Sequence, residues 1–237
     1  MKIANIEVAL VDHCGTDLSV VNAARVSFHK ESEFVEVFEQ GDHGPHLELS
    51  LSDYKLINYL AKHKHFSPFN HAFLSFRVKA PIFVARQLVK HKFMPWNEVS
   101  RRYVDDEPEF YMPDIWRAKA ENIKQGSGAN IVSRYQTWCY TVTETAMYDA
   151  LQTYTGLLEQ GVAPEQARMV LPQNTMTEWI WSGTLGAFCD MLRLRLDPHT
   201  QYESQLVAKK VYEEVVKLFP VATRALLDGV LPTPQPI

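Results

Sequence analysis

The stretch LSFRVKAPIFVARQLVKHKFMPWNEVSRRY, residues 74–103, predicts three kinds of backbone structure in succession. Apolar and polar residues alternate at its start, over 74–78, which predicts a half-buried β-strand. Pro81 is a favourable first-turn residue, and apolar residues follow it at helical spacing. They predict a helix that Pro95 must end. The predicted strand therefore leads directly into a helix, and the helix into a loop.

Charged and polar side chains gather toward the end of this stretch. On the predicted helix, Arg86 and Lys90 are four residues apart, as are Gln87 and His91, so each pair shares a face near the carboxyl end. Beyond Pro95, extended or turning backbone presents polar side chains at Asn97, Glu98, Ser100 and Arg102. Such a segment suits an anionic ligand, and it could hold a phosphate and a heterocycle together.

These charges also have a simpler interpretation. Basic residues in the last turn of a helix favour the helix macrodipole and could merely be solvated. However, the apolar run Phe93-Met94-Pro95-Trp96 lies in the middle of the charges, and a purely solvated loop has little reason to carry it. We interpret this run as a packed turn beneath a binding site.

The composition limits the classes of protein to which the chain can belong. With 237 residues, 46% of them hydrophobic, it can bury a full core. No repeat, low-complexity tract or linker divides it, so we predict a single domain over residues 1–237. A net charge of -4 argues against general nucleic-acid binding and makes the basic cluster a local patch for a small anion.

Cysteine usage and hydropathy indicate a compartment. Cys14, Cys139 and Cys189 lie far apart with no Cys-x-x-Cys pair, which gives neither a zinc ribbon nor a disulfide framework and fits a reducing cytosol. Residues 1–11 lack the long apolar run of a signal peptide, and no stretch approaches a membrane span. We therefore predict a cytoplasmic location, or the host cytoplasm for a viral source, with no membrane partner.

The remaining segments mix helical and strand patterns, which predicts an α+β fold. Strands are expected at 3–11 and 175–182, and helices at 18–27, 52–62, 131–158, 185–195 and 200–218, with a short helix opened by Pro164. Ser52 is the expected cap of the second helix, and Pro220 the expected end of the last. Turn residues and weak periodicity predict exposed or irregular segments at 34–50, 103–118 and 122–130.

Other chemistries find weaker support. The histidines match no common zinc pattern, so no metal is predicted; they are His63, His65, His71 and His91. Ser100 lacks the glycines of a nucleophile elbow, and Cys189 lies among apolar residues, as a small core residue does. Neither a Gly-x-Gly-x-x-Gly sequence nor a Walker loop is present, so a nucleotide cofactor would not be bound through those fingerprints.

Two arginines of the carboxyl-terminal half interrupt apolar sequence. Arg168 opens the run Arg-Met-Val-Leu-Pro, and Arg195 stands between two leucines. A partly buried arginine needs a partner. That partner could be a protein carboxylate such as Glu178 or Asp197, or the phosphate or carbonyl of a ligand.

Short ordered motifs run from the first predicted helix to the last quarter of the chain. They are Ala23-Ala24-Arg25-Val26-Ser27, His65-x-Ser67-Pro68-Phe69-x-His71, Phe76-x-Val78-Lys79-Ala80-Pro81-Ile82-Phe83-Val84-Ala85-Arg86-Gln87, Asn97-Glu98-x-Ser100-x-Arg102-Tyr103, Ala167-Arg168-x-Val170-Leu171-Pro172 and Leu194-Arg195-x-Asp197-x-His199. Together they resemble the flavin-dependent thymidylate synthases. That family's signature is Arg-His-Arg, seven residues and Ser. The chain keeps its spacing and His91, but it has Lys90 and Lys92 for the arginines and Arg101 where a glycine commonly follows the serine.

The resemblance implies a mostly antiparallel sheet flanked by helices and the methylation of dUMP to dTMP. Methylenetetrahydrofolate would supply the carbon, and FAD reduced by NADPH would supply the hydride, with no cysteine nucleophile. The family also implies a homotetramer whose sites are shared between subunits. Lysine keeps the positive charge of the signature arginines but lacks their planar fork, so contacts to the flavin would be fewer or water-mediated.

The resemblance also implies roles for individual residues. Arg195 would stabilise negative charge on the uracil ring, and His65 would take part in catalysis or position a ligand. Residues that would bind the substrate are Gln87, Leu88, Val89, Lys90, Glu98, Val99, Ser100, Arg101, Arg102, Arg168 and Arg195. Residues that would bind the flavin are Ser67, Lys90, His91, Lys92, Glu98, Thr184, Gly186, Asp190 and His199.

Two other functions stay open at the level of sequence. A metal-dependent phosphohydrolase acting on nucleotides would use the histidines His63, His65 and His71 with carboxylates. A non-enzymatic module that binds anions or nucleic acid would show strongly salt-dependent binding to polynucleotide without turnover.

Overall fold

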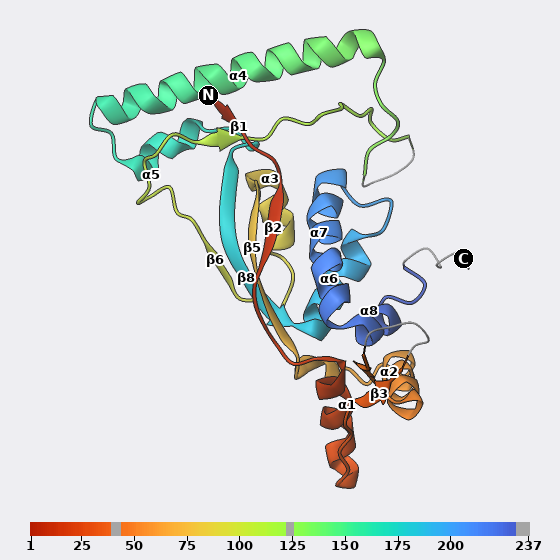
Figure 1. Ribbon diagram of the computed structural model, residues 1–237. Helices are drawn as coiled ribbons and strands as arrows, with labels where there is room; N and C mark the ends of the chain where they lie inside the picture. The colour runs from red at the N-terminus through yellow and green to blue at the C-terminus, as the bar shows by residue number, and fades with distance from the viewer. Residues whose placement is uncertain (39–43, 122–125, 231–237) are drawn as a thin grey trace.

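The computed structural model describes residues 1–38, 44–121 and 126–230. Its centre is a four-stranded antiparallel sheet with the order β2 (Glu7–Cys14), β5 (Phe73–Pro81), β8 (Met176–Thr184) and β6 (Trp96–Glu98). Helices α6, α7 and α8 lie together on one side of this sheet (Figure 1). The prediction of an α+β fold with a mostly antiparallel sheet is confirmed.

Strand β5 leads directly into a helix, as the sequence predicted. Leu74, Phe76 and Val78 are fully buried, while the polar residues between them are not, as the alternation predicted. Phe76 and Val78 pair with Trp181 and Trp179 of β8, so bulky apolar residues from both strands enter one core. The strand then continues into α3 (Ile82–Leu88).

The end of α3 corrects the prediction of a helix that runs to Pro95. The helix ends at Leu88, whose side chain is fully buried, and the backbone N–H of His91 closes a turn onto the carbonyl of Leu88 at 3.1 Å. Phe93 then has a positive φ of 61°, which lies outside the right-handed helical region. Lys90 and His91 therefore do not share helical faces with Arg86 and Gln87.

The carboxyl-terminal helices pack against the sheet. Helix α6 (Leu185–Arg195) has the predicted bounds, and α7 (Tyr202–Leu218) begins two residues later than predicted. Pro220 ends α7 but also opens α8 (Pro220–Leu226), because proline is well suited to a first turn. The carboxylate of Asp17 accepts the backbone N–H groups of Val221 and Ala222 at 2.8 and 2.9 Å and caps α8.

The amino-terminal helices form one end of the molecule (Figure 1). They are α1 (Asp17–Arg25), the short helix η1 (Val26–Phe28), α2 (Leu51–Lys62) and the short helix η2 (Ser67–Asn70). Ser50, not Ser52, caps α2, since its hydroxyl precedes the first helical residue and accepts the N–H of Asp53 at 3.2 Å. Strands β3 (Val35–Val37) and β4 (His46–Glu48) form a hairpin, and residues 39–43 of the predicted connection lie outside the described residues.

A long helix, α4 (Ser133–Glu159), crosses the opposite end (Figure 1). Its residues Met147 and Leu151 form a small apolar cluster with Phe110 and Met112. Nearby lie the parallel pair β1 (Lys2–Ile3) and β7 (Glu109–Phe110), the helix α5 (Pro164–Ala167) and the short helix η3 (Arg168–Val170). Across the part of the chain that the structure describes, no helix is both long and apolar enough to cross a membrane.

Candidate functional site

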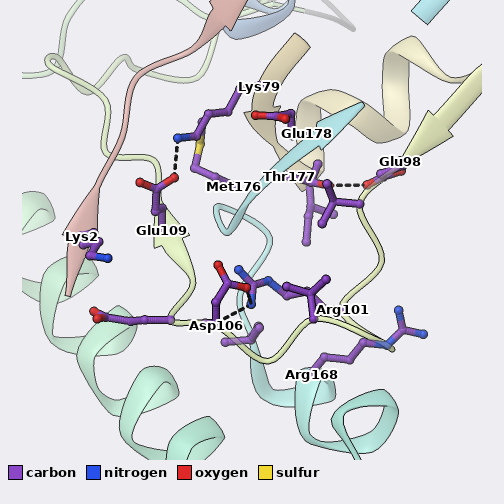
Figure 2. Close-up of a pocket in the computed structure, with 15 residues that line it drawn as sticks. Lys2, Lys79, Glu98, Arg101, Asp106, Glu109, Arg168, Met176, Thr177 and Glu178 are labelled. Carbon is purple, nitrogen blue, oxygen red and sulfur yellow. Dashed lines mark hydrogen bonds and ion pairs between the residues drawn. The ribbon is translucent and has the colours of Figure 1, made fainter. Parts of the chain in front are cut away.

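A charged pocket lies beside the edge of the sheet where β6 meets β8. Its volume is about 410 Å³, and Figure 2 shows the side chains that enclose it. They are Lys2, Lys79, Ile82, Glu98, Val99, Arg101, Val104, Asp106, Glu107, Glu109, Arg168, Leu171, Met176, Thr177 and Glu178. The pocket thus brings together four of the residues expected to bind the substrate: Glu98, Val99, Arg101 and Arg168.

Most charges of this pocket already have partners in the chain. Lys79 forms an ion pair with Glu109, and the hydrogen bond from this pair raises the pKa of the lysine (Figure 2). Arg101 donates to the backbone carbonyl of Asp106 at 2.9 Å, and the Asp106 carboxylate lies 3.7 Å from the same nitrogen. A bound anion would therefore have to compete with carboxylates for these cations.

Glu98 is held in place from two sides. Trp96 Nε1 donates to one carboxylate oxygen at 3.1 Å, and the hydroxyl of Thr177 donates to the other at 2.7 Å. Trp96 is itself fixed, because its ring stacks on Trp179 with centroids 4.3 Å apart. Both carboxylate oxygens of Glu98 therefore act as hydrogen-bond acceptors. The sheet therefore presents Glu98 to the pocket as an acceptor with a set direction.

Arg168 and the loop after β6 lie at the mouth of the pocket. Arg168 is exposed, donates to the carbonyl of Glu165 at 3.2 Å and extends away from Arg101 (Figure 2). Ser100 and Arg102, which the motif assigned to the substrate, do not line the pocket; Arg102 Nε instead donates to the Ser100 hydroxyl at 3.1 Å. The loop thus holds a guanidinium and a hydroxyl together just outside the cavity.

A second group, which we call the arginine cluster, consists of Gln87, His91, Arg195 and Ser204. Arg195 Nε donates to His91 Nε2 at 3.1 Å, and Arg195 Nη2 donates to the backbone carbonyl of Gln87 at 3.3 Å. The hydroxyl of Ser204 donates to the side-chain oxygen of Gln87 at 3.0 Å. The cluster joins α3, the turn after it, α6 and α7.

The electrostatics of the arginine cluster make His91 a neutral acceptor. Burial, and after it the charge of Arg195, lower the pKa of His91 to about 4. A guanidinium has only donors, so Nε2 of His91 must present a lone pair. Burial also lowers the pKa of Arg195, although its usual value is so high that the group stays charged. The result is a cation held against two uncharged acceptors.

The residues between Gln87 and Glu98 differ in what they offer to a ligand. Leu88 is fully buried in the core, so only its backbone could reach a ligand, whereas the side chain of Val89 is 43% exposed. Lys90 and Lys92, on either side of His91, are exposed. These lysines carry their charge into solvent while the histidine between them turns toward Arg195.

A third group lines a groove of about 870 Å³ between α1, α2 and η2. Its walls combine the aromatic rings of Tyr59 and Phe66 with the hydroxyls of Ser27 and Ser67, and His65 lies edge-on to Tyr59 with centroids 6.0 Å apart. The wall residues are Ala23, Ala24, Arg25, Ser27, Phe28, Lys30, Leu56, Tyr59, Leu60, His65, Phe66, Ser67 and Pro68. Rings, hydroxyls and cations together suit a planar aromatic group that carries phosphate.

The remaining residues predicted to bind the flavin lie elsewhere. Thr184 donates to the side-chain oxygen of Asn70 at 2.8 Å, and a Cβ at Gly186 would approach that oxygen to 2.6 Å, so glycine is needed there for packing. Asp190 is exposed at the surface, but neighbouring protein removes part of its solvent, and this desolvation raises its pKa. His199 is exposed with Nδ1 3.0 Å from the carboxylate of Asp197. None of these four residues lines the charged pocket or the groove.

Several residues of these groups were given no role from the sequence. Thr177 and Lys79 lie on neighbouring strands and enter the charged pocket only through the pairing of β5 with β8. Ser204 had one signal that could have revealed it, since it interrupts an apolar stripe of α7. Within the described residues, no group of three or more His, Cys, Asp or Glu side chains is arranged to hold a metal ion.

The chemistry of these three groups is suited to anionic, aromatic ligands. The family model described as thymidylate synthase complementing protein matches residues 9–221. The flavin-dependent thymidylate synthase from one strain of Thermus thermophilus is 38% identical over 224 residues, covering 94% of this chain and 76% of that protein. The enzyme of the same name from Thermotoga neapolitana is 38% identical over 210 residues, covering 87% and 85%.

Solved structures agree with this relationship. The UMP/dUMP methylase PolB from Streptomyces cacaoi bound with 5-Br dUMP is 32% identical, with a TM-score of 0.78 over 95% of this chain and 96% of that one. The same enzyme bound with 5-Br UMP gives 30% identity and a TM-score of 0.78. The chain belongs to the flavin-dependent thymidylate synthase family. The resemblance drawn from the motifs, the prediction of an enzyme and the flavin cofactor of the family are confirmed.

Proposed function

We propose that this protein methylates dUMP to dTMP, with methylenetetrahydrofolate as carbon donor and NADPH as the source of reducing equivalents. The observation that carries the proposal is the charged pocket, which gathers four of the residues predicted to bind the substrate from β6, the following loop and η3. Membership of the family and the likeness to a UMP/dUMP methylase support the choice of substrate. The small nucleotide substrate also agrees with the predicted cytoplasmic location.

The nucleotide would lie between the charged pocket and the loop after β6. Arg101, Arg102 and Arg168 supply guanidinium groups for the phosphate, whose geometry matches their planar forks. Ser100 offers a hydroxyl beside Arg102, and Glu98, fixed by Trp96 and Thr177, offers an acceptor. Arg101 would exchange its contact with Asp106 for the phosphate.

Arg195 would act on the pyrimidine ring. As C5 of the ring becomes nucleophilic, negative charge develops around N3 and its neighbouring carbonyl. A fixed guanidinium in a partly buried site stabilises this charge. The bonds of Arg195 to His91 and Gln87 hold the cation before the substrate arrives. The chain needs no cysteine for this step, and Cys189, fully buried with its pKa raised by burial, is poorly suited to form a thiolate.

The groove between α1, α2 and η2 is chemically suited to FAD, which supplies a hydride when it is bound and reduced. Tyr59 and Phe66 offer rings for stacking, Ser67 offers a hydroxyl, and Lys30 offers charge for phosphate. Arg25 is already tied to Asp53 at 2.5 Å, which fixes the wall of the groove. His65, exposed beside Tyr59, would position a ligand there. The exposed Lys90 and Lys92 would reach the flavin from the turn after α3.

We further propose that the working form is a homotetramer in which sites are shared between subunits. The charged pocket, the arginine cluster and the groove are lined by different residues of one chain. Exposed aromatic residues along α4, including Tyr135, Trp138 and Tyr148, offer surface that a second copy would cover. A shared site would explain why residues predicted to bind the nucleotide and the flavin are so close in the sequence yet do not line one common pocket.

Two measurements test the proposed function. Purified protein should show the absorption spectrum of a flavoprotein, and it should release tritium from C5 of labelled dUMP when methylenetetrahydrofolate and NADPH are present. A well-folded protein with neither flavin nor tritium release would refute the proposal. Bound metal with phosphate release would favour the phosphohydrolase instead, and salt-dependent binding to polynucleotide without turnover would favour the binding module.

A further inference from the structure

The inference begins with a buried hydroxyl on α7. The face of α7 that packs inward is apolar at Val207, Ala208, Val211 and Val215, yet the same face carries Ser204, which is fully buried. A buried hydroxyl is costly unless it has a hydrogen-bond partner, and an alanine would fill this position without that requirement. Among the residues that the structure describes, Ser204 has one side-chain hydrogen-bond partner, the side chain of Gln87 on α3.

This contact sets which end of the Gln87 carboxamide faces the protein. The Ser204 hydroxyl donates to Gln87 Oε1 at 3.0 Å. A carboxamide carries its acceptor and its two N–H donors on opposite ends, so Nε2 of Gln87 turns away from Ser204. Gln87 is half-buried, and over residues 1–38, 44–121 and 126–230 no protein acceptor is hydrogen-bonded to Nε2. Its two N–H groups are therefore free to donate to a ligand.

Arg195 brings further donors to the same place. Its Nη2 donates to the backbone carbonyl of Gln87 at 3.3 Å, so the guanidinium lies against the residue whose amide Ser204 orients. Two neighbouring donor groups, one charged and one neutral, match a ligand edge that carries carbonyl oxygens. The uracil ring of the proposed substrate has such an edge.

We propose that Ser204 is a positioning residue that holds Gln87 with its NH₂ group toward the pyrimidine, where it donates to a ring carbonyl beside Arg195. The inference rests on the proposed function, because it takes uracil as the ligand. Without the Ser204 hydroxyl the carboxamide can rotate by half a turn and place its own oxygen against the ring carbonyl. Two acceptors facing each other repel, so nucleotide affinity falls.

The test is a double-mutant cycle on dUMP binding, read by calorimetric titration of the flavin-loaded protein. Ser204→Ala should weaken dUMP binding about 3- to 10-fold, the range expected for one neutral hydrogen bond. Gln87→Ala should weaken it by at least as much. In the Gln87→Ala background, Ser204→Ala should have no further effect, because the residue through which it acts is gone. Flavin absorbance and thermal unfolding, measured on each variant, establish that it is folded.

Ser182→Ala is the matched control. Ser182 on β8 shares one side-chain hydrogen bond of 2.8 Å with Ser75 on β5, and its loss should leave dUMP affinity unchanged. Equal losses of dUMP affinity from Ser204→Ala in both backgrounds would overturn the inference, since they would mean a general packing role. Unchanged affinity in Ser204→Ala would also overturn it. Tritium release is measured separately, so a wild-type protein that binds dUMP without turnover refutes the proposed function and still tests Ser204.

Discussion

The charged pocket and the arginine cluster are built on different kinds of backbone. Side chains of the pocket come from strand ends, from the loop after β6 and from the short helix η3. Those of the cluster come from α3, α6 and α7 and from one tight turn. Side chains on long elements that pack on a core hold their directions better than side chains on loops. The cluster is therefore the more rigid of the two regions.

The two regions also differ in how their cations are compensated. In the charged pocket, Lys79 and Arg101 contact carboxylates that a bound anion must displace. In the arginine cluster, the hydrogen bonds of Arg195 within the described residues go only to a neutral ring and a backbone carbonyl, so its charge is not offset by a hydrogen-bonded carboxylate there. Changes in the cluster should therefore reduce the rate strongly, and changes in the pocket should mainly reduce affinity.

The largest effect is expected from Arg195→Ala. Loss of a transition-state donor should lower turnover about 10²- to 10³-fold or more, while flavin in the proposed groove should be retained. Turnover is measured by tritium release and flavin content by absorbance. Arg193→Ala, in the same turn of α6, is the control, because its guanidinium contacts the carbonyl of Leu226 rather than the cluster. Loss of flavin from Arg195→Ala alone would show that Arg195 binds cofactor.

A smaller effect on turnover is expected from His91→Phe, which keeps a ring but removes the acceptor. A hydrogen bond to a charged group contributes about 1.5–3 kcal/mol, so turnover should fall about 10- to 100-fold as Arg195 loses its direction. His91→Asn restores an acceptor and should recover part of the rate. If His91 served only the flavin, both variants would instead lose FAD affinity in titrations of the unloaded protein, with turnover unchanged at saturating FAD.

Sequence patterns predicted the rigid part of the fold well. The alternation of β5 and the apolar face of α6 are local signals, and both elements appear as predicted. The end of α3 could not be read in this way. Pro95 marks only the last residue at which a helix could stop, whereas the turn after Leu88 is set by burial of that leucine in a core formed by distant segments. Boundaries that depend on tertiary packing leave little trace in the local sequence.

The candidate site was predictable where family motifs name its residues and hidden where contacts cross the fold. The motifs named Glu98 and Arg168, which line one pocket together with Arg101, a residue that departs from the glycine common in the family. No local pattern could show that Arg195 meets His91, 104 positions away, or that Ser204 meets Gln87, 117 positions away. Those contacts arise from the packing of α6 and α7 on α3, which the sequence of a single element does not encode.

A moderate effect on affinity is expected in the charged pocket. Arg101→Ala should raise the KM for dUMP about 3- to 10-fold with little change in kcat, because the arginine contributes to binding rather than to the transition state alone. Asp106→Asn should lower this KM slightly, since it frees Arg101 from a competing carboxylate. Initial rates over a range of dUMP concentrations separate the two constants. A fall in kcat without a change in KM would place Arg101 with the arginine cluster instead.

The smallest effects concern how stability depends on pH. The arginine cluster should lose stability as pH falls, and the charged pocket should lose stability as pH rises. His91 has a folded-state pKa of about 4, below its usual 6.5, so the unfolded state binds more protons between these values and stability falls as pH drops through them. Lys79 has a raised pKa, so its contribution is present below its usual 10.5 and is lost as pH rises through the folded-state value. His91→Asn should therefore reduce the fall in Tm between pH 7 and pH 5, and Lys79→Met should reduce the fall above pH 10. Equal acid sensitivity of wild type and His91→Asn would mean that His91 is not held neutral, and the contrast between the two regions would fail.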